Sequence, residues 1–167
     1  EIESGLGNEK VYRNLKRFPE ARKIDRVAIF RIDAPLWFAS SATFFRRVDS
    51  LLQDPEVDQV ILDFSAVDFI DLAGMEQLEQ IRILAARKHV GLIIASMKGP
   101  VRDTLMAYNK YLEDHNPGNE LFPWLEEPGS IEDGARQNYM VATIQQAIAS
   151  LAQKNTSEGQ PKDILVV

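Results

Sequence analysis

The chain of 167 residues has no cysteine and only two histidines, His89 and His115, which lie far apart in the sequence. The absence of cysteine excludes disulfide bonds, thiolate catalysis and cysteine-ligated metals, and it is typical of a reducing compartment. A metal site would therefore have to be built from carboxylates alone. No apolar stretch approaches the roughly 20 residues that a membrane-spanning helix needs, and no signal-peptide pattern opens the sequence.

The motifs of common catalytic and nucleotide-binding sites are absent as well. The sequence contains no Walker-type glycine loop, no dinucleotide-binding fingerprint and no nucleophile elbow. A general nucleic-acid-binding surface would need positive charge, whereas the formal net charge is −6. We therefore predict a protein that is not an enzyme and that has no cofactor, no metal and no nucleic-acid partner.

Charged residues are distributed unevenly along the chain. Residues 10–31 are rich in lysine and arginine, whereas residues 111–134 contain neither and accumulate acidic side chains. One interpretation is two solvated faces of opposite sign. The other places the basic segment near anionic lipid headgroups or an acidic partner.

Short apolar runs predict strands that are buried on both faces, as in a parallel sheet covered by helices. These strands are expected at residues 60–62 and 90–95, and a further strand is expected at residues 27–32. Weaker extended segments are expected at residues 10–15, 36–38 and 121–122.

Apolar residues spaced three and four apart predict three amphipathic helices in the middle of the chain. The first is expected to be capped by Ser40 or Ser41 and to end at residues 54–55. The second spans residues 72–88, and the third begins at residues 99–100. The buried side of the second helix is expected to hold Leu72, Met75, Leu78, Ile81 and Ala85.

A capping-box pattern at residues 130–133 predicts a long final helix. Its apolar face would include Tyr139, Ala142 and Leu151. From residue 155 onward the composition is that of a linker.

The order of strands and helices predicts an α/β fold. We expect a mixed β-sheet with parallel core strands and helices packed against it. A single domain is expected at residues 10–152, between a flexible lead-in at residues 1–9 and a flexible tail at residues 153–167.

The segment from residue 59 to residue 78 joins a buried strand to a helix through a short loop. Asp71 stands where a helix N-cap is expected, and Asp63 and Asp68 precede it. The three carboxylates permit two interpretations. They either form a metal site, or they act separately as a strand-end residue, a loop residue and a helix cap. We favour the separate structural roles.

Residues 63–74, Asp-Phe-Ser-Ala-Val-Asp-Phe-Ile-Asp-Leu-Ala-Gly, resemble the signature of STAS domains, a fold shared by bacterial anti-sigma factor antagonists and anion transporters. Two upstream motifs narrow the resemblance. Residues 11–19, Val-Tyr-Arg-Asn-Leu-Lys-Arg-Phe-Pro, and residues 30–39, Phe-Arg-Ile-Asp-Ala-Pro-Leu-Trp-Phe-Ala, look like the lead-in of the C-terminal cytoplasmic STAS domain of SulP-type anion permeases. The resemblance covers residues 10–152.

This resemblance implies a STAS-type sheet flanked by about four to five helices, without catalysis. It also implies a role in the folding, dimerisation or regulation of a transporter, on the cytoplasmic face of the membrane. The expected partners are the transporter's own transmembrane domain, a second copy of the chain and a regulatory protein. Because the sequence begins at Glu1 without a methionine, we expect a processed product or a piece of a longer protein that follows a membrane domain.

The resemblance also directs attention to the start of the helix after the signature strand. Anti-sigma factor antagonists carry a serine there, which a partner kinase phosphorylates. The matching residue here is Ala73, which has no hydroxyl group, so that switch cannot operate. The loop is still expected to contact a partner through Asp68, Asp71, Leu72, Ala73 and Gly74. A dimer surface is expected at Leu36, Trp37 and Phe38, or on the final helix.

The transported anion cannot be read from these residues. The overall likeness of the sequence favours the cyanobacterial sodium-dependent bicarbonate transporters, and the sulfate permeases are the second candidate. Two further hypotheses are a free-standing anti-sigma factor antagonist that lacks the phosphorylatable serine, and a nucleotide-sensing module. The latter would use the helix start at residues 71–74 as a phosphate cradle, although Asp71 would repel a phosphate.

Overall fold

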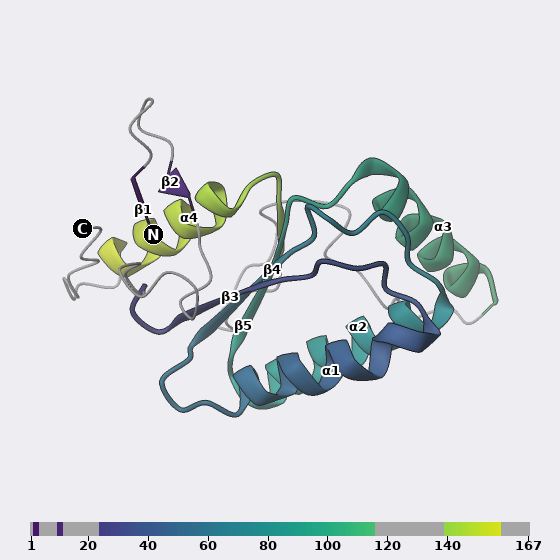
Figure 1. Cartoon of the computed structure of the whole chain (residues 1–167), viewed down its shortest axis with the longest axis horizontal. Helices are drawn as coiled ribbons and strands as arrows, with labels where there is room; N and C mark the ends of the chain where they lie inside the picture. Colours follow the sequence, from purple (N-terminus) through teal and green to yellow (C-terminus); the bar gives the residue numbers. More distant parts are fainter. Residues whose placement is uncertain (1, 4–9, 12–23, 116–138, 158–167) are drawn as a thin grey trace.

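Four parallel strands form the central sheet of the computed structural model, which describes residues 2–3, 10–11, 24–115 and 139–157 (Figure 1). They are β3 (Val27–Arg31), β4 (Gln59–Asp63), β5 (Gly91–Ala95) and β6 (Tyr139–Val141). Each strand pairs in parallel with the next, in the order β3-β4-β5-β6. The predicted α/β class with parallel core strands is confirmed.

A second, much smaller sheet lies near the start of the chain. Its strands β1 (Ile2–Glu3) and β2 (Lys10–Val11) pair antiparallel. We expected an edge strand at residues 10–15. Of that segment the structure describes only β2, which pairs with β1 and not with the four-stranded sheet.

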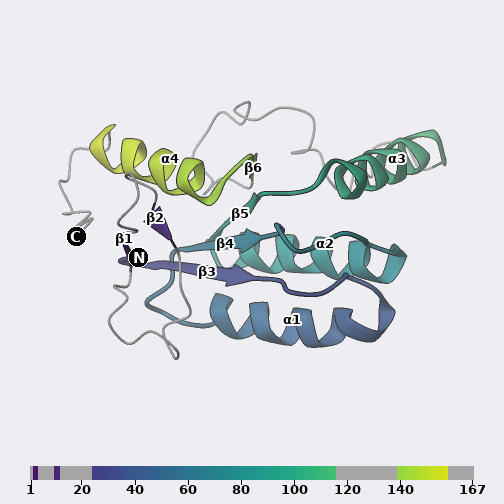
Figure 2. The ribbon, with the colours of Figure 1, turned by 45° about the horizontal axis from the view of Figure 1, so that its top comes forward.

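Helices cover both faces of the central sheet. They are α1 (Phe38–Leu52), α2 (Leu72–Arg87), α3 (Gly99–His115) and α4 (Ile144–Ser157). Figure 2 shows α1 and α2 side by side along one face and α4 on the opposite face, with α3 beyond the carboxyl end of β5. Among the helices that the structure describes, none is long and apolar enough to span a membrane.

The side chains of the central strands alternate between two apolar cores, as the period of a β-strand requires. Val60 and Leu62 belong to the larger core, which they share with buried residues of α1, α2 and α3. Ile61 and Ile93 belong to the smaller core, where they pack with Ala147 of α4. The prediction that β4 and β5 are buried on both faces is therefore confirmed.

The first helix begins earlier than the sequence predicted. Residues 36–38 were expected to be extended, with a serine cap at Ser40 or Ser41. Leu36 does form a single parallel bridge with Ile70, but Trp37 is the N-cap and Phe38 is already helical. Ser40 acts from within the first turn, because its Oγ accepts a hydrogen bond from the Trp37 N–H at 3.2 Å. The predicted serine cap was wrong.

The prediction of one long final helix through Tyr139 and Ala142 was also wrong. Residues 139–141 form β6, and α4 begins only at Ile144. The cap is Thr143, whose Oγ1 accepts a hydrogen bond from the Gln146 N–H at 3.1 Å, while Gln146 Oε1 accepts one from the Ala142 N–H at 3.0 Å. Thr143 and Gln146 have the spacing of a capping box, a local pattern from which the start of α4 can be predicted.

Two other predictions concern the end of the chain. The capping pattern at residues 130–133 and the short strand at residues 121–122 lie outside the described residues. Helix α4 continues to Ser157, so it extends past residue 152, where we expected the domain to end.

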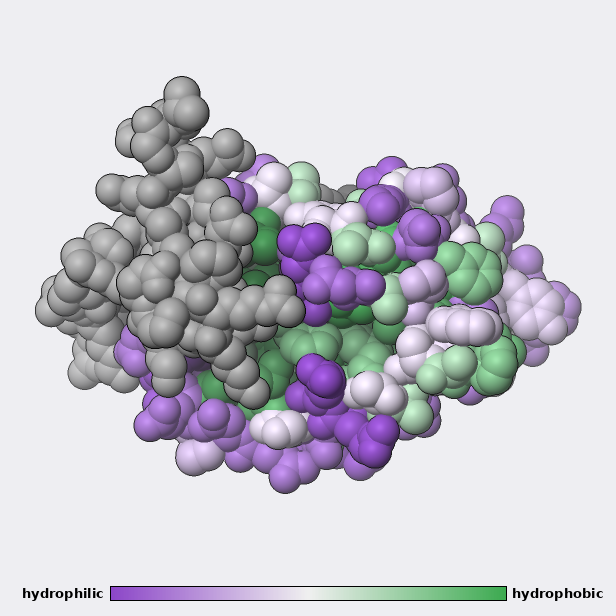
Figure 3. All heavy atoms as spheres, viewed as in Figure 1, coloured by the Kyte–Doolittle hydropathy of each residue, from purple (hydrophilic) through white to green (hydrophobic). Residues whose placement is uncertain are grey.

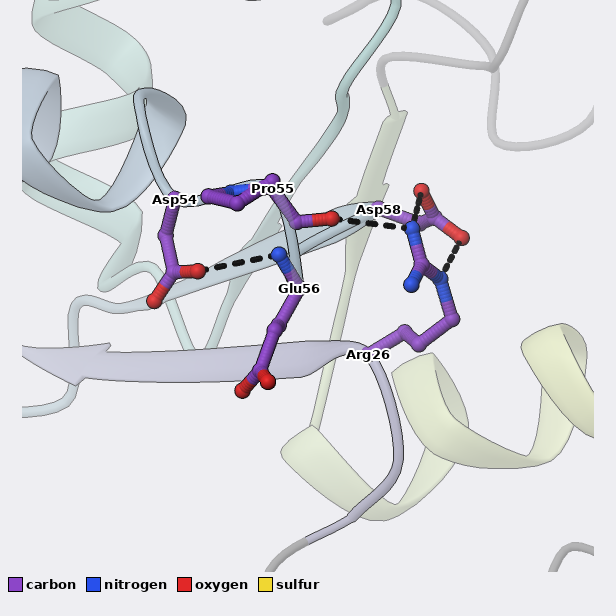
Figure 4. A network of polar contacts seen from close by, with 5 residues as sticks. All are labelled: Arg26, Asp54, Pro55, Glu56 and Asp58. Atoms are coloured by element: carbon purple, nitrogen blue, oxygen red, sulfur yellow. Dashed lines mark hydrogen bonds and ion pairs between the residues drawn. The ribbon is translucent and has the colours of Figure 1, made fainter.

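An ion pair ties the connection between α1 and β4 to the start of β3 (Figure 4). The Arg26 guanidinium donates two hydrogen bonds to the Asp58 carboxylate and one to the Pro55 carbonyl at 3.2 Å. Hydrogen bonding to Asp58 is the main cause that raises the pKa of Arg26 above its ordinary value. The Arg26 carbonyl in turn accepts the N–H groups of Asp58 and Gln59. This contact lies at the amino ends of the strands, opposite the candidate site.

Candidate functional site

The candidate site lies where the chain leaves β3 and β4 and enters α1 and α2. Two short segments run side by side there, joined by the parallel bridge between Leu36 and Ile70. The Leu36 N–H donates a hydrogen bond to the Phe69 carbonyl at 3.0 Å, and the Asp71 N–H donates one to the Leu36 carbonyl at 3.0 Å. These contacts join Leu36 to residues that follow it by 33 to 35 positions in the sequence. They hold the two segments together immediately before the two helices begin.

Asp71 caps both helices at once. Its Oδ1 accepts a hydrogen bond from the Gly74 N–H in the first turn of α2, at 2.9 Å. Its Oδ2 accepts one from the Phe38 N–H, the first residue of α1, at 3.0 Å. The single carboxylate therefore places negative charge at the positive ends of two helix dipoles. The predicted cap of α2 is confirmed, whereas its bond to α1 was not foreseen.

Gly74 allows the first turn of α2 to lie directly against the backbone of Leu36. A Cβ atom at Gly74 would fall 2.3 Å from the Leu36 carbonyl oxygen, and real Cβ atoms do not approach so closely. The glycine is therefore required by this close backbone approach. Together with the Asp71 bonds, it fixes the positions of the two helix starts relative to each other.

Four large apolar side chains are exposed around these helix starts. Trp37, Phe38, Phe69 and Leu72 expose 42, 70, 55 and 49 % of their surface. The Trp37 and Phe38 rings meet edge to face, with centroids 5.0 Å apart. We call these four residues, together with the exposed Asp68, the first-turn surface. Figure 3 shows apolar and weakly polar residues gathered at the end of the molecule where α1 begins.

The structure brings together residues of two surfaces that were predicted as separate. Trp37 and Phe38 come from the expected dimer surface, and Asp68 and Leu72 come from the expected interaction loop. The prediction that Leu36 belongs to a dimer surface was wrong. Leu36 is only 1 % exposed, because it is bridged to Ile70 and packed in the larger core. Its side chain therefore cannot contribute to a contact surface.

Leu72 is a second correction. It was expected on the buried side of α2, but it occupies the first helical position, where the sheet does not cover it. The buried stripe begins with Met75 and continues through Leu78, Ile81 and Ala85, as predicted. Ala73, which was expected to match the phosphorylated serine of the antagonists, is half-buried.

The aspartates near the loop do not converge on one point. Asp63 is buried, and its Oδ1 accepts a hydrogen bond from the Ser65 N–H at 3.0 Å, which forms a turn. Asp71 is engaged by two helix N–H groups. Within the described part of the chain, no group of three or more acidic, histidine or cysteine residues could hold a metal ion.

The family model for STAS domains matches residues 18–116, more than half of the sequence. The chain belongs to the STAS domain family. The match includes β4, the loop and the first turn of α2, so the first-turn surface lies within the matched region.

Proteins similar to this STAS domain include sulfate transporters. The chain is 27 % identical over 124 residues to sulfate transporter 3.1 of Arabidopsis thaliana, with 68 % of the chain and 19 % of the relative covered. It is 31 % identical over 103 residues to a probable sulfate transporter of Mycobacterium tuberculosis, with 59 % of the chain and 18 % of the relative covered. The chain thus spans about a fifth of the length of these curated relatives.

A solved structure supports the fold. The murine anion transporter Solute Carrier 26 family member A9, in its inward-facing state, aligns with a TM-score of 0.65 and 22 % identity. The alignment covers 90 % of this chain and 21 % of that protein. At this identity the likeness shows a shared fold.

Proposed function

We propose that this STAS domain is a non-catalytic regulatory and dimerisation domain on the cytoplasmic face of a SulP-type anion transporter. The observation that carries the proposal is its similarity to about one fifth of the length of sulfate transporters. The remaining four fifths of such a protein would hold the membrane-spanning transport domain, which we propose as the direct partner of this chain.

The chemistry of the first-turn surface favours contact over catalysis. Ala73 offers no hydroxyl group for phosphorylation. The N–H groups of Phe38 and Gly74, which would otherwise attract an anion at the helix starts, already donate to the Asp71 carboxylate. These features speak against both the nucleotide-sensing module and the phosphoryl switch of a free-standing antagonist. They leave exposed apolar side chains, which are typical of protein contact sites.

The transported ion is proposed to be a small oxyanion. The names of the relatives favour sulfate. Bicarbonate with sodium coupling, toward which the overall likeness leaned, is the second candidate. Uptake of labelled sulfate and labelled bicarbonate by the full-length protein, with and without sodium, would distinguish the two.

Deletion of the domain from the full-length protein tests the regulatory and dimerisation role. We expect lower anion uptake per molecule, or loss of the dimer in cross-linking and sedimentation. The amount of truncated protein in the membrane is measured in parallel, so that uptake can be expressed per molecule. Unchanged uptake, protein level and oligomeric state would contradict the proposal. Incubation of the domain with an anti-sigma kinase and ATP tests the antagonist alternative, for which phosphate incorporation would be required.

A further inference from the structure

We propose that the first-turn surface binds an apolar segment bearing lysine or arginine on the cytoplasmic side of the membrane domain of the same protein. The inference rests on the proposed function, and it adds which surface makes the contact and what chemistry its partner must have. The surface is the set of residues defined above, Trp37, Phe38, Asp68, Phe69 and Leu72.

Exposed apolar side chains are concentrated at this surface. Among the described residues, seven large apolar side chains are exposed, and four of them belong to this surface. They come from two segments whose backbones are hydrogen-bonded to each other. The four side chains are therefore clustered and not scattered over the surface of the molecule. Exposed aromatic and aliphatic residues gathered in this way mark protein contact sites.

The charged residues in the segments around these side chains are acidic. The segments that form the surface, residues 32–45 and 63–81, contain acidic side chains but no lysine or arginine. Of the arginines that flank them along the chain, Arg31 and Arg82 are paired with carboxylates, whereas Arg46 donates hydrogen bonds to the Ala42 carbonyl and the Thr43 hydroxyl group, both at 3.3 Å. Arg31 pairs with Asp33 at 2.6 Å, and Arg82 pairs with Glu79 at 2.6 Å. Asp68 is exposed beside Phe69, so the surface is apolar and acidic.

This charge decides between the candidate occupants. In a two-fold symmetric dimer through the same surface, each protomer would present its exposed Asp68 to a copy of the same sign. Anionic lipid headgroups would be repelled for the same reason. A cationic apolar segment is complementary to the surface. Loops on the cytoplasmic side of membrane proteins carry an excess of lysine and arginine, and about four fifths of the relatives' length lies outside the matched region.

The backbone beneath the surface is held in place before any partner binds. The Asp71 carboxylate fixes the first residue of α1 and the first turn of α2 together, and Gly74 lets α2 lie against Leu36. Phe38 and Leu72, whose side chains are exposed, are the first residues of these two helices. Little conformational freedom of the backbone is therefore lost when a partner binds.

Site-specific photo-cross-linking in the full-length protein tests the inference. A benzophenone amino acid replaces Phe38, and the linked peptides are identified by mass spectrometry after irradiation in membranes. We expect links to lysine- or arginine-bearing segments between the membrane helices. The same probe at Met106, which is also exposed but lies on α3, should give at least about fivefold fewer of these links.

Charge reversal provides the matched control. Asp68→Lys should lower the yield of the Phe38 link about two- to fivefold, the effect expected for one exposed ion pair. Glu56→Lys makes the same charge change at the opposite end of the sheet and should leave the yield unchanged. Equal yields in the two variants would overturn the role of charge. Thermal unfolding of each variant verifies that the fold is retained.

Other linking partners would overturn the inference. Links chiefly to the first-turn surface of a second copy would show a dimer contact, and links to lipid or to a separate protein would identify a different occupant. The absence of any link from Phe38 would also contradict it. If uptake still depends on the domain while no such link forms, this inference fails and the proposed function stands. If the link forms but deletion leaves uptake, level and oligomeric state unchanged, the proposed function fails instead.

Discussion

Asp71 Oδ2 accepts a hydrogen bond from the Phe38 N–H at 3.0 Å, although the two residues lie 33 positions apart. The same carboxylate caps its own helix through Gly74. One structural carboxylate therefore joins the starts of two helices.

Removal of this carboxylate should destabilise the domain. Asp71→Ala removes the caps of α1 and α2, each worth about 1 kcal/mol, so we expect a loss of about 2 kcal/mol in the free energy of unfolding. Urea denaturation measures it. Asp68→Ala, an exposed neighbour, is the control and should change stability by less than about 0.5 kcal/mol. Equal effects of the two substitutions would show that Asp71 is not a shared cap.

Gly74→Ala should destabilise although alanine favours helices. The added Cβ would meet the Leu36 carbonyl oxygen at 2.3 Å, and relief of that clash must move the backbone, at a cost of about 2 kcal/mol or more. Gly99→Ala is the matched control at the start of α3, because nothing lies within 4 Å of its added Cβ. There we expect no loss beyond about 0.5 kcal/mol. A harmless Gly74→Ala would contradict the close packing of α2 against Leu36.

Truncation to alanine should lower the free energy of unfolding strongly at Leu36 and hardly at all at Phe38. Leu36→Ala empties a buried site and should cost about 2–5 kcal/mol of unfolding free energy. Phe38→Ala removes a larger side chain, but one that is 70 % exposed, so we expect a change below about 0.5 kcal/mol. Chemical denaturation of both variants checks the assignment of Leu36 to the core and Phe38 to the surface. A large loss in Phe38→Ala would place Phe38 in a contact within the domain.

The ion pair between Arg26 and Asp58 should contribute stability that salt reduces. Asp58→Asn should lower the denaturation midpoint, and the difference from the unaltered protein should shrink in 1 M NaCl, because the pair is partly exposed. Asp33→Asn is the control, since the more exposed pair with Arg31 is expected to contribute little. A difference for Asp58→Asn that does not depend on salt would indicate that hydrogen-bond geometry and not charge holds this connection.

The sequence predicted the parts of the fold that depend on local pattern. The continuous apolar runs identified β3, β4 and β5, and helical spacing identified α1, α2 and α3 and the buried stripe of α2 from Met75 onward. Asp71 was found as the cap of α2 because the capping residue and its helix are neighbours in sequence. Its second bond could not be found in this way, since no pattern in one sequence pairs residue 38 with residue 71.

The failures have the same physical origin. Leu36 and Leu72 were placed by local hydrophobic pattern, whereas their burial is decided by contacts between distant segments. Leu36 is buried because Ile70 lies beside it, and Leu72 is exposed because α2 begins beyond the cover of the sheet. The helix expected through Tyr139 gave way to β6, which is stabilised by pairing with β5. The local capping pattern at Thr143 would have placed the start of α4 correctly.

The most direct test of the central claim, that this STAS domain acts on an anion transporter through its first-turn surface, is a transport measurement. Uptake of labelled sulfate and bicarbonate is compared in vesicles that contain equal amounts of the full-length protein with and without the double substitution Asp68→Lys and Leu72→Ser. We predict uptake at least about fivefold lower, the lower end of typical coupling between sites, and unchanged uptake in the Glu56→Lys control. Full uptake of both anions by a correctly folded double variant would contradict the claim.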